Sequence, residues 1–184
     1  IDSNYNFHEE DYIIYFGGLV PWKGIKTLIN AVKDIDVNLK IVGEGDQRPE
    51  LEEYAKINNK IEFLGHRTGN ELINLVKKSK FIVVPSEWYE NCPYTIMEGM
   101  SYGKPVIGAK IGGIPELVRD NETGLLFESK NTLDLRNKIS LLISDESMRM
   151  RFSKNAYKIS LHEFNRKTYY NNLIKLYNKS LEKE

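Results

Sequence analysis

The chain has 184 residues, which is enough for one sizeable hydrophobic core and too few for two ordinary domains. Its 26 Lys and Arg residues balance its 26 Asp and Glu residues, so it lacks the basic excess that is typical of DNA- or RNA-binding proteins. The single cysteine, Cys92, excludes an internal disulfide and a cysteine-rich zinc site, and no apolar run approaches the length of a membrane span.

Short apolar runs alternate with helical patterns along most of the chain. After a polar stretch over residues 1–11, strands are expected at 12–16, 39–42, 61–64, 81–84, 105–109 and 124–127. Helices are expected between them at 23–34, 48–57, 69–78, 93–103 and 114–119, and after them at 133–143, 145–159 and 165–184. This alternation predicts an α/β, Rossmann-like three-layer domain: a parallel sheet of about six strands flanked by helices, with further helices at the C-terminal end.

Glycine or polar residues follow each predicted strand. They include Gly17, Gly43, Gly65, the segment 86–90, and a Gly112–Gly113 pair that is expected to form a flexible loop. Because the carboxyl ends of parallel strands meet at one edge of the sheet, where ligands of such folds bind, this pattern predicts a ligand site at that edge.

The stretch from 81 to 98 carries most of the chemistry. A buried strand leads through a polar and aromatic loop to Pro93, which suits the start of a helix. The backbone N–H groups of the next three residues, 94–96, are free donors at the positive end of that helix, which favours phosphate. Glu90 and Glu98 bracket this anion site. One reason for carboxylates there is a ligand with vicinal hydroxyl groups as hydrogen-bond donors, and the alternative is that Glu90 is a solvated loop residue and Glu98 a surface helix residue. A ligand with sugars at both ends and phosphates between them, a nucleotide sugar, matches this arrangement.

Glu90 and Glu98 are separated by seven residues and are followed by Gly-Met-Ser-Tyr-Gly-Lys-Pro-Val-Ile-Gly-Ala-Lys-Ile-Gly-Gly-Ile-Pro-Glu-Leu-Val. This block closely resembles the E-x7-E region of the retaining glycosyltransferases of family GT4, whose two-domain architecture is the GT-B fold. The segment Phe-Gly-Gly-Leu-Val-Pro-Trp-Lys-Gly over residues 16–24 resembles the Gly-Arg-Leu…Lys-Gly motif of the same family. Lys23 and Gly24 match that motif, whereas Gly18 occupies the position of its arginine.

The resemblance implies roles for particular residues. Glu98 would bind the ribose hydroxyls, and Glu90 would contact the donor hexose near its anomeric centre. Lys23, together with the amides around Tyr94 and Thr95, would hold the diphosphate, so that Glu90 and Lys23 form the expected catalytic pair. The remaining donor-binding residues would be Asn91, Cys92, Pro93, Gly17, Gly18, His66 and Arg67, the last two beside the nucleobase.

The family needs no bound metal for the donor diphosphate. Asp34-Ile35-Asp36 has the D-x-D spacing of metal-dependent sugar transferases, but it falls at the end of a predicted helix, away from the strand ends. We expect a helix-to-strand turn there.

The resemblance also implies a domain organisation. Residues 1–11 would be the remnant of an interdomain hinge, 12–160 the nucleotide-sugar-binding domain, and 161–184 a helix that packs toward an N-terminal domain absent from this sequence. The full-length protein would transfer a hexosyl unit from a UDP- or GDP-sugar, with retention, to an acceptor glycan, lipid-linked sugar or small molecule. The 184-residue chain alone would be inactive, since the acceptor site belongs to the other domain. The implied location is the cytoplasm, with peripheral attachment to the inner face of the membrane as an open alternative.

Two alternatives stay open. Losing a charged hydrogen bond at Gly18 should weaken donor binding by roughly one to two orders of magnitude, which favours a degenerate, non-catalytic binding module unless Arg67, Arg48 or Lys110 compensates. The other alternative is half of a GT-B sugar-nucleotide epimerase or phosphorylase, against which the E-x7-E block argues.

Overall fold

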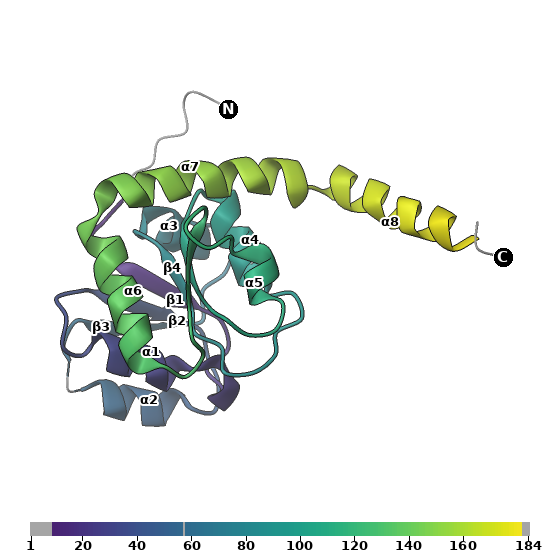
Figure 1. Ribbon diagram of the computed structural model, residues 1–184. Coiled ribbons are helices and arrows are strands. Elements are labelled where there is room, and N and C mark those ends of the chain that lie inside the picture. The colour runs from purple at the N-terminus through teal and green to yellow at the C-terminus, as the bar shows by residue number, and fades with distance from the viewer. Residues whose placement is uncertain (1–8, 57, 182–184) are drawn as a thin grey trace.

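The computed structural model describes residues 9–56 and 58–181. Figure 1 shows a sheet enclosed by helices, with one further helix reaching away from the body of the molecule. The predicted hinge segment 1–11 lies outside the described residues, apart from its last three positions.

The sheet has six parallel strands in the order β3-β2-β1-β4-β5-β6, which is the classic order of a Rossmann fold. Their bounds are β1 Ile13–Phe16, β2 Leu39–Val42, β3 Ile61–Gly65, β4 Ile82–Val84, β5 Val106–Ala109 and β6 Gly124–Phe127. All four residues of β1 and of β5 are buried, because helices cover both faces of the sheet. The predicted parallel sheet of six strands is therefore confirmed.

The helices fill the intervals between the strands and continue after β6. They are α1 Ile25–Val32, α2 Arg48–Ala55, α3 Gly69–Lys78, α4 Tyr94–Ser101, α5 Ile114–Leu117, α6 Thr132–Ser144, α7 Glu146–Glu163 and α8 Arg166–Leu181. Helix α1 packs against α2 and α6, whereas α7 crosses from α6 to α4 (Figure 1). A single core therefore runs from β1 through α6 to Phe152 and Ile159 of α7.

The first helix begins two residues later than the sequence predicts. Pro21–Lys23 forms a short 3-10 turn, and Gly24 then adopts a left-handed conformation with φ of 68° before α1 begins at Ile25. A Cβ atom at Gly24 would lie 2.0 Å from the carbonyl oxygen of Pro85, so only glycine fits between this turn and the loop after β4.

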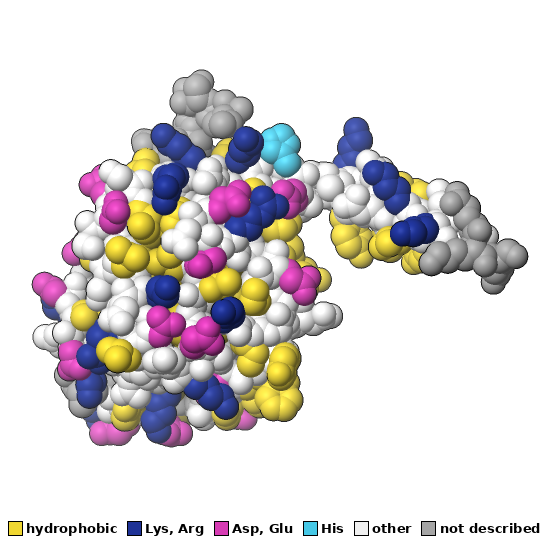
Figure 2. Space-filling model, viewed as in Figure 1, with side chains coloured by type: hydrophobic (Ala, Val, Ile, Leu, Met, Phe, Trp, Pro, Cys, Tyr) yellow, Lys and Arg dark blue, Asp and Glu magenta, His cyan; other side chains and the backbone are white. Residues whose placement is uncertain are grey.

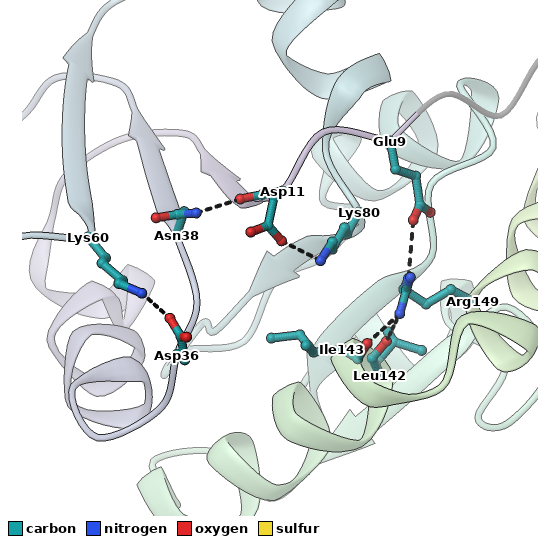
Figure 3. A network of polar contacts seen from close by, with 9 residues as sticks. All are labelled: Glu9, Asp11, Asp36, Asn38, Lys60, Lys80, Leu142, Ile143 and Arg149. Atoms are coloured by element: carbon teal, nitrogen blue, oxygen red, sulfur yellow. Dashed lines mark hydrogen bonds and ion pairs between the residues drawn. The ribbon is translucent and has the colours of Figure 1, made fainter.

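Polar side chains line the amino ends of the strands, at the edge opposite the predicted site (Figure 3). Asn38 and Lys80, which precede β2 and β4, both bond to Asp11, and the Lys80 ammonium keeps the pKa of Asp11 below its ordinary value. Asp36 pairs with Lys60, and Asp34 pairs with Arg136 at 2.8 Å. Both carboxylates of the D-x-D sequence thus serve ion pairs at this edge, in the bends between α1 and β2 as predicted.

Two buried cations lie on the same side. Arg149 donates to the carbonyl oxygens of Leu142 and Ile143, and its Nε lies 3.2 Å from Glu9 (Figure 3). Lys104 is 2% exposed and donates from Nζ to the carbonyl oxygen of Ser79 at 2.7 Å. Burial lowers the pKa of Lys104 to about 8, against which the charge of Glu9 acts weakly.

Helix α8 makes few contacts with the rest of the chain. Among the described residues, its main contacts are with α7. None of the residues that the structure describes in α8 is buried. Figure 2 shows hydrophobic side chains gathered on one side of α8, with Lys and Arg side chains beside them. The exposed apolar residues are Tyr169, Tyr170, Ile174, Leu176, Tyr177 and Leu181. Among the described residues, no helix is long and apolar enough to cross a membrane.

Candidate functional site

Three loops at the carboxyl ends of β1, β2 and β3 are joined backbone to backbone. Gly17 N–H donates to the carbonyl oxygen of Val42 at 3.0 Å, and Leu19 N–H donates to that of Glu44 at 2.8 Å. Gly43 N–H donates to the carbonyl oxygen of Gly65 at 2.9 Å. The glycines predicted to follow these strands therefore form one continuous rim.

Two adjoining cavities open at this rim. The larger has a volume of about 380 Å³, and the smaller has a volume of about 200 Å³. The larger is lined by Phe16, Gly17, Gly18, Val42, Gly43, Glu44, His66, Arg67 and Leu72. The smaller is lined by Phe16, Gly69, Leu72, Ile73, Val76, Glu98 and Tyr102. Four of the predicted donor-binding residues thus share one cavity, and Glu98 lies on its neighbour across Phe16 and Leu72.

Lys23, in the loop after β1, and Glu90, in the loop after β4, form an ion pair at the same edge of the sheet. Lys23 Nζ lies 2.5 Å from Glu90 Oε1, and the Ser86 hydroxyl donates to the same oxygen at 2.9 Å. The Lys23 side chain is 28% exposed and that of Glu90 is 18% exposed, so each charge is largely removed from water. The sequence predicts both residues for the site, but nothing in the sequence pattern indicated that they pair.

Four hydrogen bonds to other segments of the chain hold the loop that carries Glu90. Gly113 N–H donates to the carbonyl oxygen of Glu90 at 2.7 Å, and the Ser129 hydroxyl donates to that of Ser86 at 3.1 Å. The Thr27 hydroxyl donates to Glu87 Oε1 at 2.6 Å, and Glu87 N–H donates to the carbonyl oxygen of Trp22 at 2.8 Å. The Gly112–Gly113 pair was expected to form a flexible loop. It instead holds the backbone of Glu90 through the Gly113 N–H group.

Thr27 and Ser129 were missed by sequence reasoning. Each lies dozens of residues from its partner along the chain, and isolated hydroxyl residues carry no motif that marks them.

The start of α4 offers two of the three amide donors that the sequence predicts. Pro93 is buried and acts as the N-cap residue, and its carbonyl oxygen accepts from Ile96 N–H at 3.0 Å. Ile96 is therefore not a free donor. The N–H groups of Tyr94 and Thr95 have no partner among the residues that the structure describes, so they remain available to an anion.

The residues between Glu90 and Pro93 are solvent-exposed. Asn91 is exposed, and Cys92 is an exposed free thiol. Gly113 lies directly beneath them, since a Cβ atom there would lie 2.2 Å from the carbonyl oxygen of Asn91.

Tyr15 lies under the rim on β1. Its hydroxyl donates to the carbonyl oxygen of Gly18 at 2.7 Å. Burial raises the pKa of Tyr15 well above its ordinary value, and the negative charge of Glu90 raises it further. The phenol therefore stays neutral and fixes the backbone of Gly18.

Exposed aromatic residues adjoin Lys23 and Glu90 in the sequence. Trp22 precedes Lys23 in the chain, and Trp88 and Tyr89 precede Glu90. Trp22 is 52% exposed, Trp88 is 66% exposed and Tyr89 is 74% exposed. The rings of Trp88 and Tyr89 meet edge to face, with 6.5 Å between their centroids.

No group of three or more His, Cys, Asp or Glu side chains within 9–56 and 58–181 is arranged to hold a metal ion.

Residues 1–159 match the sequence family described as glycosyl transferases group 1. The chain belongs to this family. An uncharacterised glycosyltransferase of Methanocaldococcus jannaschii is 38% identical over 158 residues, which are 85% of this chain and 45% of that protein. The glycosyltransferase domain described here spans less than half the length of this relative and of the other curated relatives that it matches.

Solved structures share the fold. The Anabaena protein HepE, crystallised in complex with UDP, superposes with a TM-score of 0.83 at 25% identity, over 93% of this chain and 49% of HepE. The C-terminal domain of the group 1 glycosyltransferase LpcC from Francisella tularensis superposes with a TM-score of 0.74 at 26% identity, over 86% of this chain and 89% of that domain. The predicted fold class, a Rossmann-like half of a GT-B glycosyltransferase, is confirmed.

Proposed function

We propose that this chain is the donor-binding C-terminal domain of a glycosyltransferase that transfers a hexosyl unit from a nucleotide diphosphate sugar with retention. The observation that carries the proposal is the arrangement at the carboxyl edge of the sheet. Two adjoining cavities, two free helix amides and a half-buried Lys–Glu pair lie on consecutive loops of one rim. The match of this chain to nearly all of the C-terminal domain of LpcC supports its place in the larger protein.

The donor would lie along this rim. Its base would enter the larger cavity between Gly17 and the His66–Arg67 loop, and its ribose hydroxyls would donate to Glu98 on the adjoining cavity. The diphosphate would meet the amides of Tyr94 and Thr95 at the positive end of α4. UDP is the first candidate for the nucleotide because the HepE structure contains it, and GDP is the second.

The Lys23–Glu90 pair would act at the reacting end of the donor. Glu90 would accept hydrogen bonds from the hexose hydroxyls near the anomeric carbon, while Lys23 faces the leaving diphosphate. Donors held in place before the reaction stabilise the charge that develops as the diphosphate leaves. Glu90 holds Lys23 in position at 2.5 Å, and Gly113 and Ser86 hold Glu90. The acceptor would be bound by the other half of the full-length protein, so this chain would bind the donor without turnover.

The direct test is thermal unfolding of the chain with UDP, GDP, ADP and dTDP, repeated on Glu98→Ala. A nucleotide at 100 times its dissociation constant adds about 2.7 kcal/mol to the free energy of unfolding. For a chain of this length that raises the Tm by about 5–11 °C. We expect one nucleotide to give such a shift and Glu98→Ala to reduce it by more than half, because the variant loses the ribose-binding carboxylate.

Glu62→Ala is the matched control, since Glu62 is an exposed carboxylate on β3 outside both cavities. It should leave the shift unchanged. The proposal would be contradicted if none of the four nucleotides raised the Tm, or if Glu98→Ala and Glu62→Ala reduced the Tm shift equally.

A further inference from the structure

A diphosphate in this site needs cationic partners, and most cations at the rim are already paired with carboxylates. Lys23 lies 2.5 Å from Glu90. Arg48 contacts Glu44 and lies 2.7 Å from Glu52. Lys110 lies 3.2 Å from Glu128. Each of these charges is balanced locally, so none adds a net positive charge for a ligand.

Arg67 differs from them. Its nearest carboxylate oxygen, on Glu71, is 3.8 Å from Nε, and the Glu71 side chain is 76% exposed. An exposed pair at that distance contributes little and is easily exchanged for another anion. The guanidinium also donates to the carbonyl oxygen of its neighbour His66 at 3.0 Å, which leaves most of its five N–H donors available.

Arg67 also lies at the candidate donor site. It follows β3 and lines the cavity of about 380 Å³, which Gly18 of the loop after β1 lines too. Glu44 is the other charged residue on that cavity, and it pairs with Arg48, which also binds Glu52. Of the cations that the structure describes on this rim, Arg67 alone lines the cavity without a close carboxylate.

We propose that Arg67, on the wall of the cavity assigned to the nucleobase, is a diphosphate-binding residue whose long side chain swings from Glu71 and reaches past the base to donate to the phosphate oxygens of the nucleotide. A guanidinium suits this role because its planar fork binds phosphate in a bidentate manner. The inference rests on the proposed function, since it names a further contact of the same donor site.

Gly18 gives this inference a sharp test, because a second arginine fits there. A Cβ atom on Gly18 would come no closer than 3.9 Å to any other residue that the structure describes, its nearest contact being Val20. Its backbone φ lies outside the left-handed range, so a side chain is not strained. An arginine at position 18 would start from the wall of the cavity that Arg67 also lines.

The experiment measures dissociation constants for UDP, GDP and uridine by titration with the full 184-residue chain. Arg67→Gln should weaken binding of the preferred nucleotide by about 10- to 100-fold, as expected for loss of a charged hydrogen bond. Uridine, which has no phosphate, should lose less than about 2-fold, because a ligand without charge gains little from a guanidinium. The affinity of Arg67→Lys should fall between those of the unmodified chain and Arg67→Gln. Adding Gly18→Arg to Arg67→Gln should recover most of the lost affinity.

Arg151→Gln is the control for net charge. Arg151 is exposed on α7, far from the rim, and its substitution removes one positive charge, as Arg67→Gln does. It should leave nucleotide affinity unchanged, and unfolding of each variant without ligand checks that it is folded. Unchanged affinity in Arg67→Gln, an equal loss for uridine, or no rescue by Gly18→Arg would overturn the role of Arg67 while leaving the proposed function standing. Absence of nucleotide binding by the unmodified chain would overturn the proposed function and this assignment together.

Discussion

Lys104 is a charge placed where water cannot reach it. It lies directly before β5 and is 2% exposed, and its ammonium is satisfied by the carbonyl oxygen of Ser79. Because burial disfavours the charged form, its pKa falls to about 8 from the ordinary value of 10.5. Burying this charge therefore costs about 3 kcal/mol of stability at neutral pH, at about 1.4 kcal/mol for each pKa unit.

This cost predicts a distinctive pH dependence. Between pH 8 and 10.5 the folded chain has lost the Lys104 proton while the unfolded chain still binds it, so the free energy of unfolding rises with pH. From pH 7 to pH 9.5 the rise should be about 2 kcal/mol, and Lys104→Met should remove it. Urea unfolding of both proteins at the two pH values measures the difference.

Lys33→Met serves as the control, because Lys33 is an exposed lysine at the end of α1. It should keep the full rise. The comparison stays below pH 10, since the raised pKa of Tyr15 acts in the opposite sense: above its ordinary pKa the unfolded chain loses that proton first, and stability falls. Equal pH dependence in the Lys104 and Lys33 variants would contradict the cost assigned to Lys104.

At the scale of elements, the loop between β4 and α4 takes its shape from the Gly112–Gly113 turn. Gly113 binds the carbonyl oxygen of Glu90, and there is no room for a side chain between it and Asn91. The Glu90 carboxylate, which pairs with Lys23, is thus positioned by a turn more than twenty residues later in the chain.

Gly113→Ala should therefore displace the loop and destabilise the fold. The added Cβ atom would sit 2.2 Å from the carbonyl oxygen of Asn91, and such overpacking costs about 1–3 kcal/mol, which is a fall in Tm of about 2–12 °C. Thermal unfolding measures it. Gly18→Ala is the matched variant, because Gly18 also lies on the rim with ordinary φ but its added Cβ atom would make only an ordinary van der Waals contact, 3.9 Å from Val20. It should not lower the Tm, and equal losses in the two variants would show that the clash is not the cause.

The strands and helices could be predicted from the sequence, whereas the tertiary contacts between their loops could not. Apolar runs bounded by breakers marked all six strands, and the alternation with helices gave the parallel sheet. The start of α1 was wrong by two residues, because the left-handed turn at Gly24 depends on the carbonyl oxygen of Pro85, which is remote in the chain. The motifs predict Lys23 and Glu90 for the candidate site, whereas the ion pair between them depends on the mutual packing of two loops and was not predicted.

At the scale of the whole molecule, α8 stands apart from the core. It buries none of its described residues, whereas α7 buries Phe152, Ala156 and Ile159 against the sheet and its helices. Most helical stability in proteins comes from tertiary packing of an apolar face rather than from intrinsic propensity. We propose, as the resemblance implies, that the apolar side of α8 packs on the N-terminal domain of the full-length protein.

Removal of residues 166–184 should then leave the remaining chain as stable as before. The truncated chain loses no buried side chain that the structure describes in α8, so its free energy of unfolding should change by less than about 0.5 kcal/mol. Urea unfolding monitored by circular dichroism makes the comparison. A chain ending before α7 is the control and should be strongly destabilised. A loss of several kcal/mol on removing α8 alone would mean that α8 contributes to the core.

The placement of the two tryptophans has an optical consequence. The chain has only Trp22 and Trp88, and both are more than half exposed on the loops beside the Lys23–Glu90 pair. Tryptophan fluorescence of this protein therefore comes from the rim, and we expect its emission maximum to lie near that of indole in water. Because both rings are already more than half exposed, we expect unfolding to move the emission wavelength little and a domain that buries these rings to move it further, to the blue. The protein carries its own reporter of occupancy, and that reporter does not register the stability of the fold.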